Sequence, residues 1–457
     1  MMDTISAAHA VDGRLLGNNV RFTRVATDTR ALAPGDLFVA LSGERFDGHV
    51  FVAEAFAKGA AAALVASTHS AGLEGSLIAV ADPLAALGRL AAYWRRQFAL
   101  PLALVVGSNG KTTIKEMLAS ILRVHHTDSK VLATHGNYNN AIGLPLTLLR
   151  LRSQHGAAVI ELGVNRRGET RELASIAWPT LVLINNAQRE HQEFLHGVAE
   201  VAREHADAIL ELAPDGTAVI NADDIHTKVW RDGAHSVGAA MTTFGLDTRA
   251  DVMARFTLRG DGSDVELATP MGEARVSLAV PGRHTVSNAL AAAAAALAMG
   301  ASLTAVVAGL ERFRAFAGRL AARQSLSGAL VFDDTYNANP DSVRAAVDVL
   351  AAVSGKKWLV LGDMGEVGDA GRAFHREIGA YAQAAGINAL FGLGELAADA
   401  VAAFGAGACH FATIEALVDA LQKELEPSVT VLIKGSRFMR MERVVAKLSG
   451  DATADAH

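Results

Sequence analysis

The sequence LALVVGSNGKTT, residues 102–113, predicts a strand, a glycine-containing loop and the first turn of a helix. Its apolar residues 102–106 are typical of a strand that is buried on both faces. Glycines in such a loop let backbone N–H groups close around phosphate oxygens, and the positive end of the following helix strengthens the attraction. The stretch therefore predicts a nucleotide-binding P-loop on a parallel sheet. Beyond the loop, apolar side chains recur at helical spacing, at Ile114, Met117, Leu118, Ile121 and Leu122.

The loop carries two side chains suited to phosphate chemistry. Lys111 supplies a positive point charge, and the Thr112 hydroxyl can ligate Mg²⁺. The spacing departs from the general Walker pattern, because Val105 stands where the first glycine belongs, and an ordinary turn with a chance Gly-Lys-Thr is the alternative. A P-loop occurs in switches, kinases and ligases alike, so it predicts nucleotide binding and no particular reaction. The residues predicted here to bind nucleotide are Gly107, Ser108, Asn109, Gly110, Lys111, Thr112 and Thr113.

Apolar strands and helical segments alternate after the loop, which predicts a parallel sheet wrapped by helices. These strands are 157–162, 181–184 and 218–220. From 251 to 280, short segments separated by glycine-containing turns predict a small antiparallel insert. The alanine-rich segment 288–299 then predicts a core helix.

Two further blocks flank this one. At the N-terminal side, strands at 37–41 and 77–80 enclose an alanine-rich segment, 54–65, that predicts a helix. At the C-terminal side, a series of strands alternating with helices is typical of a second doubly wound domain; they lie at 330–332, 357–361, 389–393 and 430–433. We therefore predict an α/β protein with three domains. They are a small N-terminal α/β substrate domain at 1–83, a central P-loop domain with a parallel sheet and an antiparallel insert at 84–315, and a C-terminal Rossmann-like domain at 316–457.

Composition narrows the classes of partner. The 457-residue chain has 51% hydrophobic and 20% charged residues, which is ordinary for a folded protein. Lys plus Arg number 42 against 48 for Asp plus Glu, so the net charge is −6, which predicts no nucleic-acid partner and no attraction to anionic membranes. Cys409 is the only cysteine, and neither a secretory signal nor an apolar run near the roughly 20 residues of a membrane span is present. We expect a cytoplasmic protein without membrane insertion.

Segments similar to those of the Mur ligases occur in that family's order along nearly the whole chain. Residues 107–115, GSNGKTTIK, resemble the family's shortened P-loop. In the N-terminal block, residues 27–30, 34–41 and 47–49 resemble the segment that holds the UDP end of the family's substrate, and a hairpin with solvated charges is the alternative. The resemblance implies that substrate is bound by Thr29, Arg30, Asp47 and His49.

Four later segments also resemble the family. Residues 134–145, THGNYNNAIGLP, resemble a segment that contacts substrate beside the P-loop; the amides of Asn137, Asn139 and Asn140 suit a peptide and a sugar, although asparagines also form turns. Residues 333–340, DDTYNANP, resemble the subfamily that accepts a dipeptide rather than one amino acid, as do 362–366 and 434–437. The resemblance implies that Asn288 contacts the nucleotide base, that Asp334 binds the ribose, and that Tyr336, Asn337 and Asn339 bind substrate.

Candidate metal ligands come from the same regions. Glu161 ends a predicted buried strand, where its side chain points into the nucleotide crevice of a parallel sheet, and it resembles the family's Mg²⁺-binding glutamate. With Thr112 it offers the oxygen ligands that a hard cation prefers. His191 matches a histidine that faces a second metal in the family, although a lone histidine is usually structural.

Many Mur ligases carry a lysine on the next helix that carbon dioxide converts to a metal-binding carbamate. His205 occupies that position here, and it either hydrogen-bonds a metal-bound water, or leaves the anionic role to Glu204, or merely packs beside the site.

The resemblance implies a reaction of peptidoglycan synthesis. ATP phosphorylates the terminal carboxylate of UDP-N-acetylmuramoyl-tripeptide, and the amine of D-alanyl-D-alanine attacks the acyl phosphate. Arg319 matches an arginine that reaches the terminal phosphate, so the implied catalytic residues are Lys111, Glu161, His191 and Arg319, with ATP and Mg²⁺ as cofactors. We expect a monomer with small-molecule partners only. Two alternatives stay open: a Mur or folate-polyglutamate-type ligase that adds a single amino acid, and a P-loop switch that makes no bond.

Overall fold

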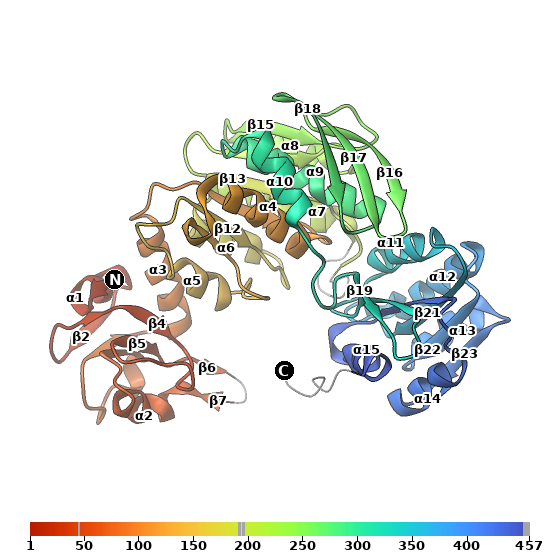
Figure 1. The fold of residues 1–457 in the computed structure, drawn as a ribbon. Helices are drawn as coiled ribbons and strands as arrows, with labels where there is room; N and C mark the ends of the chain where they lie inside the picture. The colour runs from red at the N-terminus through yellow and green to blue at the C-terminus, as the bar shows by residue number, and fades with distance from the viewer. Residues whose placement is uncertain (44–45, 191–192, 194–196, 451–457) are drawn as a thin grey trace.

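The structure is a computed structural model that describes residues 1–43, 46–190, 193 and 197–450 of the chain. Three α/β units follow one another, each built around its own main sheet, with the central unit between the other two (Figure 1). This arrangement confirms the predicted three-domain α/β fold. The predicted domain boundaries stay predictions. They fall at the start of α3 (Pro83–Arg95), and between α10 (Leu303–Arg312) and β19 (Ala321–Gln324).

The N-terminal unit contradicts one predicted element: the helix at 54–65 is wrong in its second half. Helix α2 ends at Ala57, Gly59 adopts a φ of 92°, and residues 62–66 form strand β8. Strand β8 pairs in parallel with a neighbour on each side, and residues 62–65 are fully buried. Alanine prefers helix over valine by only about 0.5 kcal/mol per residue, so burial and two ladders of hydrogen bonds decide the conformation. The elements of this unit are β1 (Met2–Asp3), α1 (Thr4–Ala10), β2 (Arg14–Leu16), β3 (Arg21–Phe22), β4 (Arg24–Ala26), β5 (Asp36–Val39), β6 (Ser42–Gly43), β7 (Phe46–Asp47), α2 (Val52–Ala57), β8 (Ala62–Ala66) and β9 (Leu77–Val80).

The central unit has a six-stranded parallel sheet in the order β11-β12-β10-β13-β14-β15. The strands predicted from the sequence are confirmed as β10, β12, β13 and β14, whereas the edge strands escape prediction because β11 is short and β15 is half-exposed. The predicted antiparallel insert is confirmed as β16-β17-β18. The P-loop strand β10 thus lies inside the sheet. The elements after α3 are β10 (Leu102–Val106), α4 (Lys111–His126), β11 (Val131–Ala133), α5 (Gly143–Leu148), β12 (Ala157–Glu161), α6 (Glu169–Ala177), β13 (Leu181–Ile184), α7 (Val198–Ala206), β14 (Thr217–Asn221), α8 (Thr227–Ser236), β15 (Ala240–Phe244), β16 (Met253–Arg259), β17 (Gly262–Thr269), β18 (Gly272–Leu278), α9 (Arg283–Ala298) and α10.

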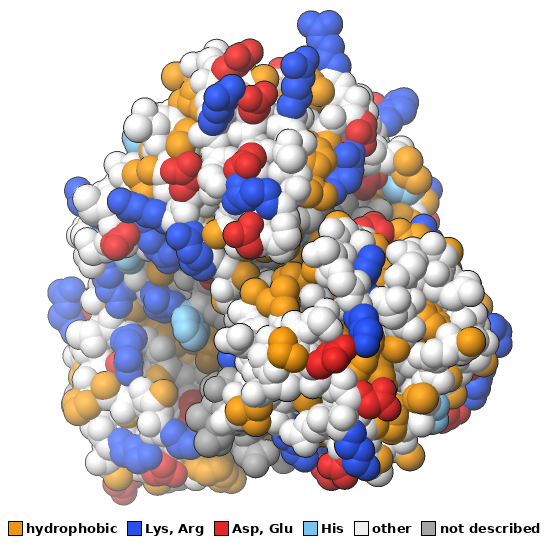
Figure 2. All heavy atoms as spheres, turned by 45° about the vertical axis from the view of Figure 1, so that its right-hand side comes forward, with side chains coloured by type: hydrophobic (Ala, Val, Ile, Leu, Met, Phe, Trp, Pro, Cys, Tyr) orange, Lys and Arg blue, Asp and Glu red, His pale blue; other side chains and the backbone are white. Residues whose placement is uncertain are grey.

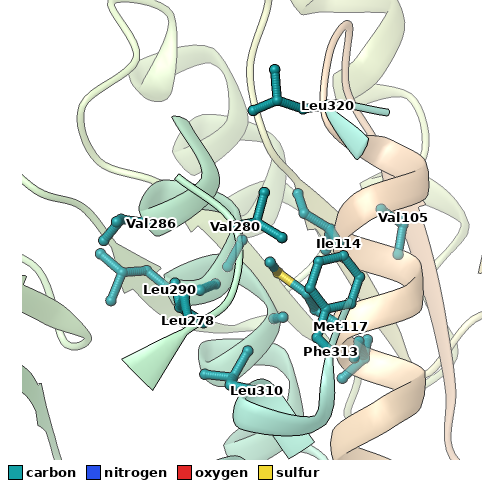
Figure 3. Close-up of a cluster of buried hydrophobic side chains, with 14 of the residues drawn as sticks. Val105, Ile114, Met117, Leu278, Val280, Val286, Leu290, Leu310, Phe313 and Leu320 are labelled. Atoms are coloured by element: carbon teal, nitrogen blue, oxygen red, sulfur yellow. The ribbon is translucent and has the colours of Figure 1, made fainter. Parts of the chain in front are cut away.

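The helix that begins at the P-loop is held by close packing. Figure 3 shows side chains of α4, α9 and α10 gathered with Leu278 and Val280 in one hydrophobic cluster. The alanine run of α9 is buried, as predicted for a core helix. At the contact between α10 and α4, a Cβ added to Gly309 would lie 2.4 Å from the Cα of Ile121, so only glycine permits this approach. Helix α4 therefore gives the P-loop a rigid base.

Helix α3, which connects the first two units, ends on a buried arginine. The Arg95 side chain is 1% exposed, and its guanidinium donates to the carbonyl oxygens of Phe98 at 2.6 Å, Ala177 at 3.2 Å, Trp178 at 3.3 Å and Leu100 at 3.4 Å. Burial lowers the pKa of Arg95 to about 10, so it keeps its charge at neutral pH. The arginine therefore supplies donors to carbonyl groups that would otherwise be buried without partners.

Substituting Arg95 with leucine is expected to lower the free energy of unfolding by on the order of 3 kcal/mol, because the carbonyl groups lose their donors while staying buried. Urea denaturation followed by circular dichroism measures the change. The matched control is Arg96→Leu, because Arg96 is exposed and also stacks on Trp178, at 5.4 Å from the ring centroid. Equal effects of the two substitutions would contradict a special role for Arg95.

The C-terminal unit has a six-stranded sheet in the order β19-β20-β24-β21-β22-β23, parallel except for β19. Strands β20, β24 and β21 are neighbours, so the segments that follow them lie side by side at one edge. Across the part of the chain that the structure describes, no helix is long and apolar enough to cross a membrane. The elements are β19, β20 (Leu330–Asp334), α11 (Pro340–Ala351), β21 (Lys356–Gly362), α12 (Gly371–Ala384), β22 (Ala389–Leu393), α13 (Ala397–Phe404), β23 (Ala408–Phe411), α14 (Ile414–Glu424), β24 (Val429–Lys434) and α15 (Glu442–Ser449).

Candidate active site

The P-loop, residues 107–110, joins β10 to α4. Gly107 and Gly110 adopt φ angles of 139° and 83°, which side chains rarely permit. A Cβ on Gly110 would lie 2.5 Å from Oδ1 of Asn288, so this predicted base-contacting residue sits directly against the loop. The Lys111 ammonium donates to the carbonyl oxygens of Gly107 and Ser108. The lysine therefore lies across the loop that its positive charge is predicted to serve.

Glu161 lies beside the P-loop, and its two carboxylate oxygens differ in their hydrogen bonding. Its side chain is buried, and Oε1 accepts hydrogen bonds from Asn139 Nδ2 at 2.8 Å and from Thr112 Oγ1 at 3.3 Å. Oε2 is buried and has no hydrogen-bond partner among the described residues, although Lys115 Nζ lies 3.9 Å away. A desolvated carboxylate oxygen is costly unless a cation shares its charge. This arrangement, with the Thr112 hydroxyl beside it, fits a hard cation such as Mg²⁺.

Arg319, which lies between α10 and β19, reaches the P-loop region from the C-terminal side of the chain. Its Nη2 lies 3.3 Å from Thr112 Oγ1, and its guanidinium carbon lies 3.9 Å from the ring centroid of Tyr336. A polar cavity of about 260 Å³ opens between the units here. The predicted site residues that line it are Ser108, Asn109, Gly110, Lys111, Thr112, Asn139, Glu161, Arg319, Tyr336, Asn337 and Asn339.

An adjoining cavity of about 140 Å³ holds the residues predicted to contact the nucleoside. Asn288, Thr113 and Asp334 line it, together with His284, whose pKa is lowered by burial so that the ring stays neutral. Asp334 already has partners, because Oδ2 pairs with Lys434 Nζ at 2.6 Å and Oδ1 accepts from the backbone of Leu320 at 3.2 Å. The two cavities share Asn109, Gly110 and Arg319, so the predicted nucleotide-binding residues other than Gly107 line two adjoining cavities.

Asn339, predicted to bind substrate, also connects two units in this structure. Its Oδ1 accepts from the backbone N of Ser342 at 2.8 Å and thereby caps α11. Its Nδ2 donates to Oδ1 of Asn109 at 2.9 Å, and Nδ2 of Asn109 donates to Gln188 Oε1 at 2.7 Å. The amide of Asn339 thus ties α11 to the P-loop, and its role in substrate binding stays a prediction.

The residues predicted to hold the UDP end lie in the N-terminal unit and line neither of these cavities. Arg30 is exposed and pairs with Asp28 at 2.7 Å, while Thr29 is buried. Nε2 of His49 accepts from the backbone N of Ala66 at 2.9 Å, so Nδ1 carries the proton and donates to Asp47 at 2.6 Å. Hydrogen bonds from His49 and Ser42 hold the pKa of Asp47 well below its usual range.

Of the remaining predicted residues, Asn137 is exposed, and Asn140 accepts from the backbone of Ile142 and Gly143 at the start of α5. Asn337 uses Oδ1 to accept from the backbone N of Ala338 at 2.9 Å. His191 lies outside the described residues. Asn140 therefore also serves the turn-forming role that was the alternative to substrate binding.

The contacts of Glu204 exclude the alternative in which this residue supplies the anion near His205. Both carboxylate oxygens of Glu204 accept backbone hydrogen bonds at the start of α6, from Gly168 at 2.8 Å and Thr170 at 2.9 Å. Glu204 therefore does not supply an anion to the P-loop region. Glu190, which the sequence analysis did not single out, lies there instead: Oε1 is 3.4 Å from His205 Nε2 and Oε2 is 3.4 Å from Lys111 Nζ.

Two further residues escape sequence analysis. Lys115, four residues after Lys111 on α4, is fully buried and donates to Thr134 O at 2.9 Å; its helical spacing is the signal that it faces the same site. Arg189 pairs with Asp341 at 2.6 Å and Glu377 at 2.7 Å, and these carboxylates raise the pKa of the arginine further. The segment 188–190 therefore connects the P-loop with the C-terminal unit.

Three family descriptions match the chain: the Mur ligase middle domain at residues 105–296, the glutamate ligase domain of Mur ligases at 318–437, and the catalytic domain of the Mur ligase family at 21–95. The chain is 39% identical over 455 residues to UDP-N-acetylmuramoyl-tripeptide--D-alanyl-D-alanine ligase of Escherichia coli (strain K12), with 97% of each chain covered. It is 34% identical to the protein of that name from Bacillus subtilis (strain 168), with 93% of this chain and 92% of the other covered.

Solved structures agree with these similarities. MurF from Acinetobacter baumannii has a TM-score of 0.90 and 36% sequence identity, covering 99% of this chain and 100% of that one. MurF ligase from Thermotoga maritima, solved in complex with ADP, has a TM-score of 0.84 and 25% identity, covering 95% of this chain and 98% of that one.

Proposed function

The chain belongs to the Mur ligase family, and from that premise we propose that it is the ATP-dependent, ADP-forming ligase that joins D-alanyl-D-alanine to UDP-N-acetylmuramoyl-tripeptide. The observation that carries the proposal is the cavity in which Lys111, Glu161 and Arg319 converge from two units. Names of relatives that match over nearly the whole chain support the choice of substrates. The product would be the UDP-muramoyl-pentapeptide of peptidoglycan synthesis, made in the cytoplasm by a monomer, in support of cell shape and division.

The proposed chemistry follows from the charges around the cavity. A carboxylate is a poor acyl donor, so the tripeptide must first take a phosphoryl group from ATP and become an acyl phosphate. Lys111 and Arg319 offset the negative charge of the transferring phosphoryl group, and Arg319 does so from the C-terminal unit. Glu161, with Thr112, would hold Mg²⁺, which supplies further charge neutralisation when bound. Bringing the units together also excludes water, which would hydrolyse the acyl phosphate.

The proposal assigns the remaining residues by their location. Asn288 and Asp334 would contact the base and the ribose, because they line the cavity that adjoins the P-loop. Asn139, bonded to Glu161, would lie beside the tripeptide end. Thr29, Arg30, Asp47 and His49 would hold the UDP end from the N-terminal unit, and Figure 2 shows Lys and Arg side chains gathered where that unit faces the central one, which suits a diphosphate.

Phosphate release tests this function. With ATP, Mg²⁺ and UDP-N-acetylmuramoyl-tripeptide, D-alanyl-D-alanine should stimulate release, whereas D-alanine or another single amino acid should not. Preference for a single amino acid would support the related ligase types, and turnover without any acceptor would support a nucleotide switch. With ¹⁸O in the tripeptide's terminal carboxylate, one label should appear in the released phosphate; unlabelled phosphate would reject the acyl phosphate.

Ligation is expected to be independent of bicarbonate. A carbamate requires a lysine amine, and the family's lysine position is occupied by His205, which is buried on α7, a helix whose sequence VAEVAREHA contains no lysine. Phosphate release is measured in decarbonated buffer before and after bicarbonate is added. Strong stimulation would contradict the prediction and indicate that another lysine forms the carbamate.

A further inference from the structure

We propose that Arg437 and Glu366 hold the two charged ends of the incoming dipeptide, with Arg437 on its carboxylate and Glu366 on its amine. This assignment rests on the proposed function and names residues that the sequence analysis did not assign to a ligand. Both residues line the polar cavity that also contains Lys111, Glu161 and Arg319. The dipeptide would therefore be presented to the acyl group from the C-terminal unit.

Three segments build this part of the cavity, and each follows a different strand. Residues 335–339 follow β20, 363–366 follow β21 and 435–437 follow β24. Because β20, β24 and β21 are parallel neighbours, these segments meet at one edge of the sheet. Ligands of open α/β sheets bind at the carboxyl ends of the strands. The location of Arg437 and Glu366 is therefore one at which a small ligand is expected.

Ser436 ties the three segments together. It is buried, and its hydroxyl accepts from the backbone N of Gly365 at 2.7 Å and donates to the carbonyl oxygen of Ala338 at 3.1 Å. Its own backbone N donates to the carbonyl oxygen of Asp363 at 3.0 Å. One side chain thus sets the relative position of the segments that carry Glu366, Arg437 and the predicted substrate-binding residues.

The segment that carries Glu366 is also held from behind. His375 is fully buried; Nε2 accepts from the backbone N of Met364 at 3.0 Å, and Nδ1 donates to the carbonyl oxygen of Gly371 at 2.7 Å. Burial lowers the pKa of His375, so the ring stays neutral and Nε2 remains an acceptor at neutral pH. Asp363 accepts from the backbone N of Ala397 at 2.7 Å. Glu366 therefore projects from a fixed loop, as ligand recognition requires.

Glu366 has a strained backbone with an exposed side chain. Its φ is 57°, in the left-handed region that is unfavourable for residues other than glycine. Such strain collects at ligand sites, where the surrounding structure enforces it. Glu366 lines the cavity with a carboxylate that is opposite in charge to the guanidinium of Arg437.

Of the two cations Lys434 and Arg437, Arg437 is the one whose present partner a ligand can more readily replace. Lys434 is committed to Asp334 at 2.6 Å and to the carbonyl oxygen of Asn337 at 2.8 Å. Arg437 is half-exposed; its contacts to described residues include an ion pair with Glu442 at 3.3 Å and a ring contact to Tyr336 at 5.8 Å. An exposed ion pair of this kind contributes little to stability, because solvent screens it. A ligand carboxylate, bound by both arms of the guanidinium, can therefore replace it.

A zwitterionic dipeptide needs one cation and one anion, separated by more than a single amino acid can span. A second residue adds about 3.5 Å to the distance between amine and carboxylate. Arg437 and Glu366 supply one cation and one anion to the lining of the same cavity, as the two charged ends of a dipeptide require. Apolar contact for a methyl group is available from Phe438, which is exposed and lies against Gly365, where a Cβ would come within 2.8 Å of its ring.

The test compares D-alanyl-D-alanine with its C-terminal amide, which lacks the carboxylate charge. With the wild-type protein, amidation should raise KM for the dipeptide at least about 10-fold, since a charge-assisted pair is lost. With Arg437→Gln, KM for the dipeptide should rise by a similar factor while amidation has little further effect. KM for ATP should stay within about twofold. Glu366→Gln should raise KM for the dipeptide and its amide alike.

The matched control is Arg440→Gln, because Arg440 is exposed on the same segment but does not line the cavity; it should behave as wild type. If Arg437→Gln shows no measurable ligation, calorimetry with a non-hydrolysable ATP analogue and the tripeptide measures binding of the dipeptide and its amide instead. Wild-type discrimination between these two in the variant would overturn the proposal. If the wild-type protein itself fails to use D-alanyl-D-alanine, the proposed function has failed rather than this assignment alone.

Discussion

Replacing Lys111 with alanine is expected to lower kcat/KM for ligation by at least about 100-fold, equivalent to about 3 kcal/mol of transition-state stabilisation. Lys111 begins α4 and its ammonium lies across the P-loop, on the carbonyl oxygens of Gly107 and Ser108. The two described cations nearest in role do not take over its charge directly, because Lys115 donates to Thr134 and Arg319 reaches the site from the C-terminal unit. The transferring phosphoryl group would therefore lose a cation that the other two do not replace.

The measurement is phosphate release with saturating tripeptide and dipeptide, together with the thermal midpoint by circular dichroism. Helix α4 keeps its hydrophobic face in the variant, so the midpoint should be close to that of the wild type. The control is Lys228→Ala, because Lys228 is 82% exposed on α8 and pairs only with Asp232 among the described ion pairs. Wild-type turnover by a folded Lys111→Ala protein would refute the proposed site.

The second large effect is expected from Glu161→Gln, which keeps the shape of the side chain and removes its charge. Within the part of the chain that the structure describes, the buried Oε2 of Glu161 has no hydrogen-bond donor, and the carboxylate lies beside Thr112. Loss of the charge should lower ligation at least about 100-fold, because a bound metal ion contributes several kcal/mol to charge stabilisation. The Mg²⁺ concentration that gives half-maximal activity should rise at least about tenfold, since the cation loses an anionic ligand.

Binding provides a readout that does not depend on catalysis. Calorimetric titration of the ATP-loaded protein with Mg²⁺ should show weaker binding for Glu161→Gln than for wild type. The matched control is Glu116→Gln, because Glu116 also contacts Lys115, at 2.8 Å, but is not among the residues that line the cavity. An unchanged Mg²⁺ requirement in Glu161→Gln would remove this residue from the proposed metal site.

Most of the fold is predictable from local pattern. Strands such as β10 and β13 are continuous apolar runs, and the amphipathic spacing of α4 follows directly from its side chains. The error at 54–65 has a different origin, because residues 62–66 have the composition of a helix and become a strand only through their neighbours β5 and β9. The edge strands β19 and β23 carry half-exposed residues, so they lack the continuous apolar signal of the strands between them.

The sequence by itself determined the P-loop and its chemistry, because a strand, a glycine loop, a lysine and a helix are contiguous and their geometry is local. Only the tertiary structure decided which distant residues meet there. Asn339 pairs with Asn109, Glu190 lies between Lys111 and His205, and Ser436 joins three segments. These contacts arise from the order of strands in two sheets and from the packing of one unit on another. Periodicity along a chain does not encode that order, because a strand's hydrophobic pattern is the same whichever neighbour it pairs with.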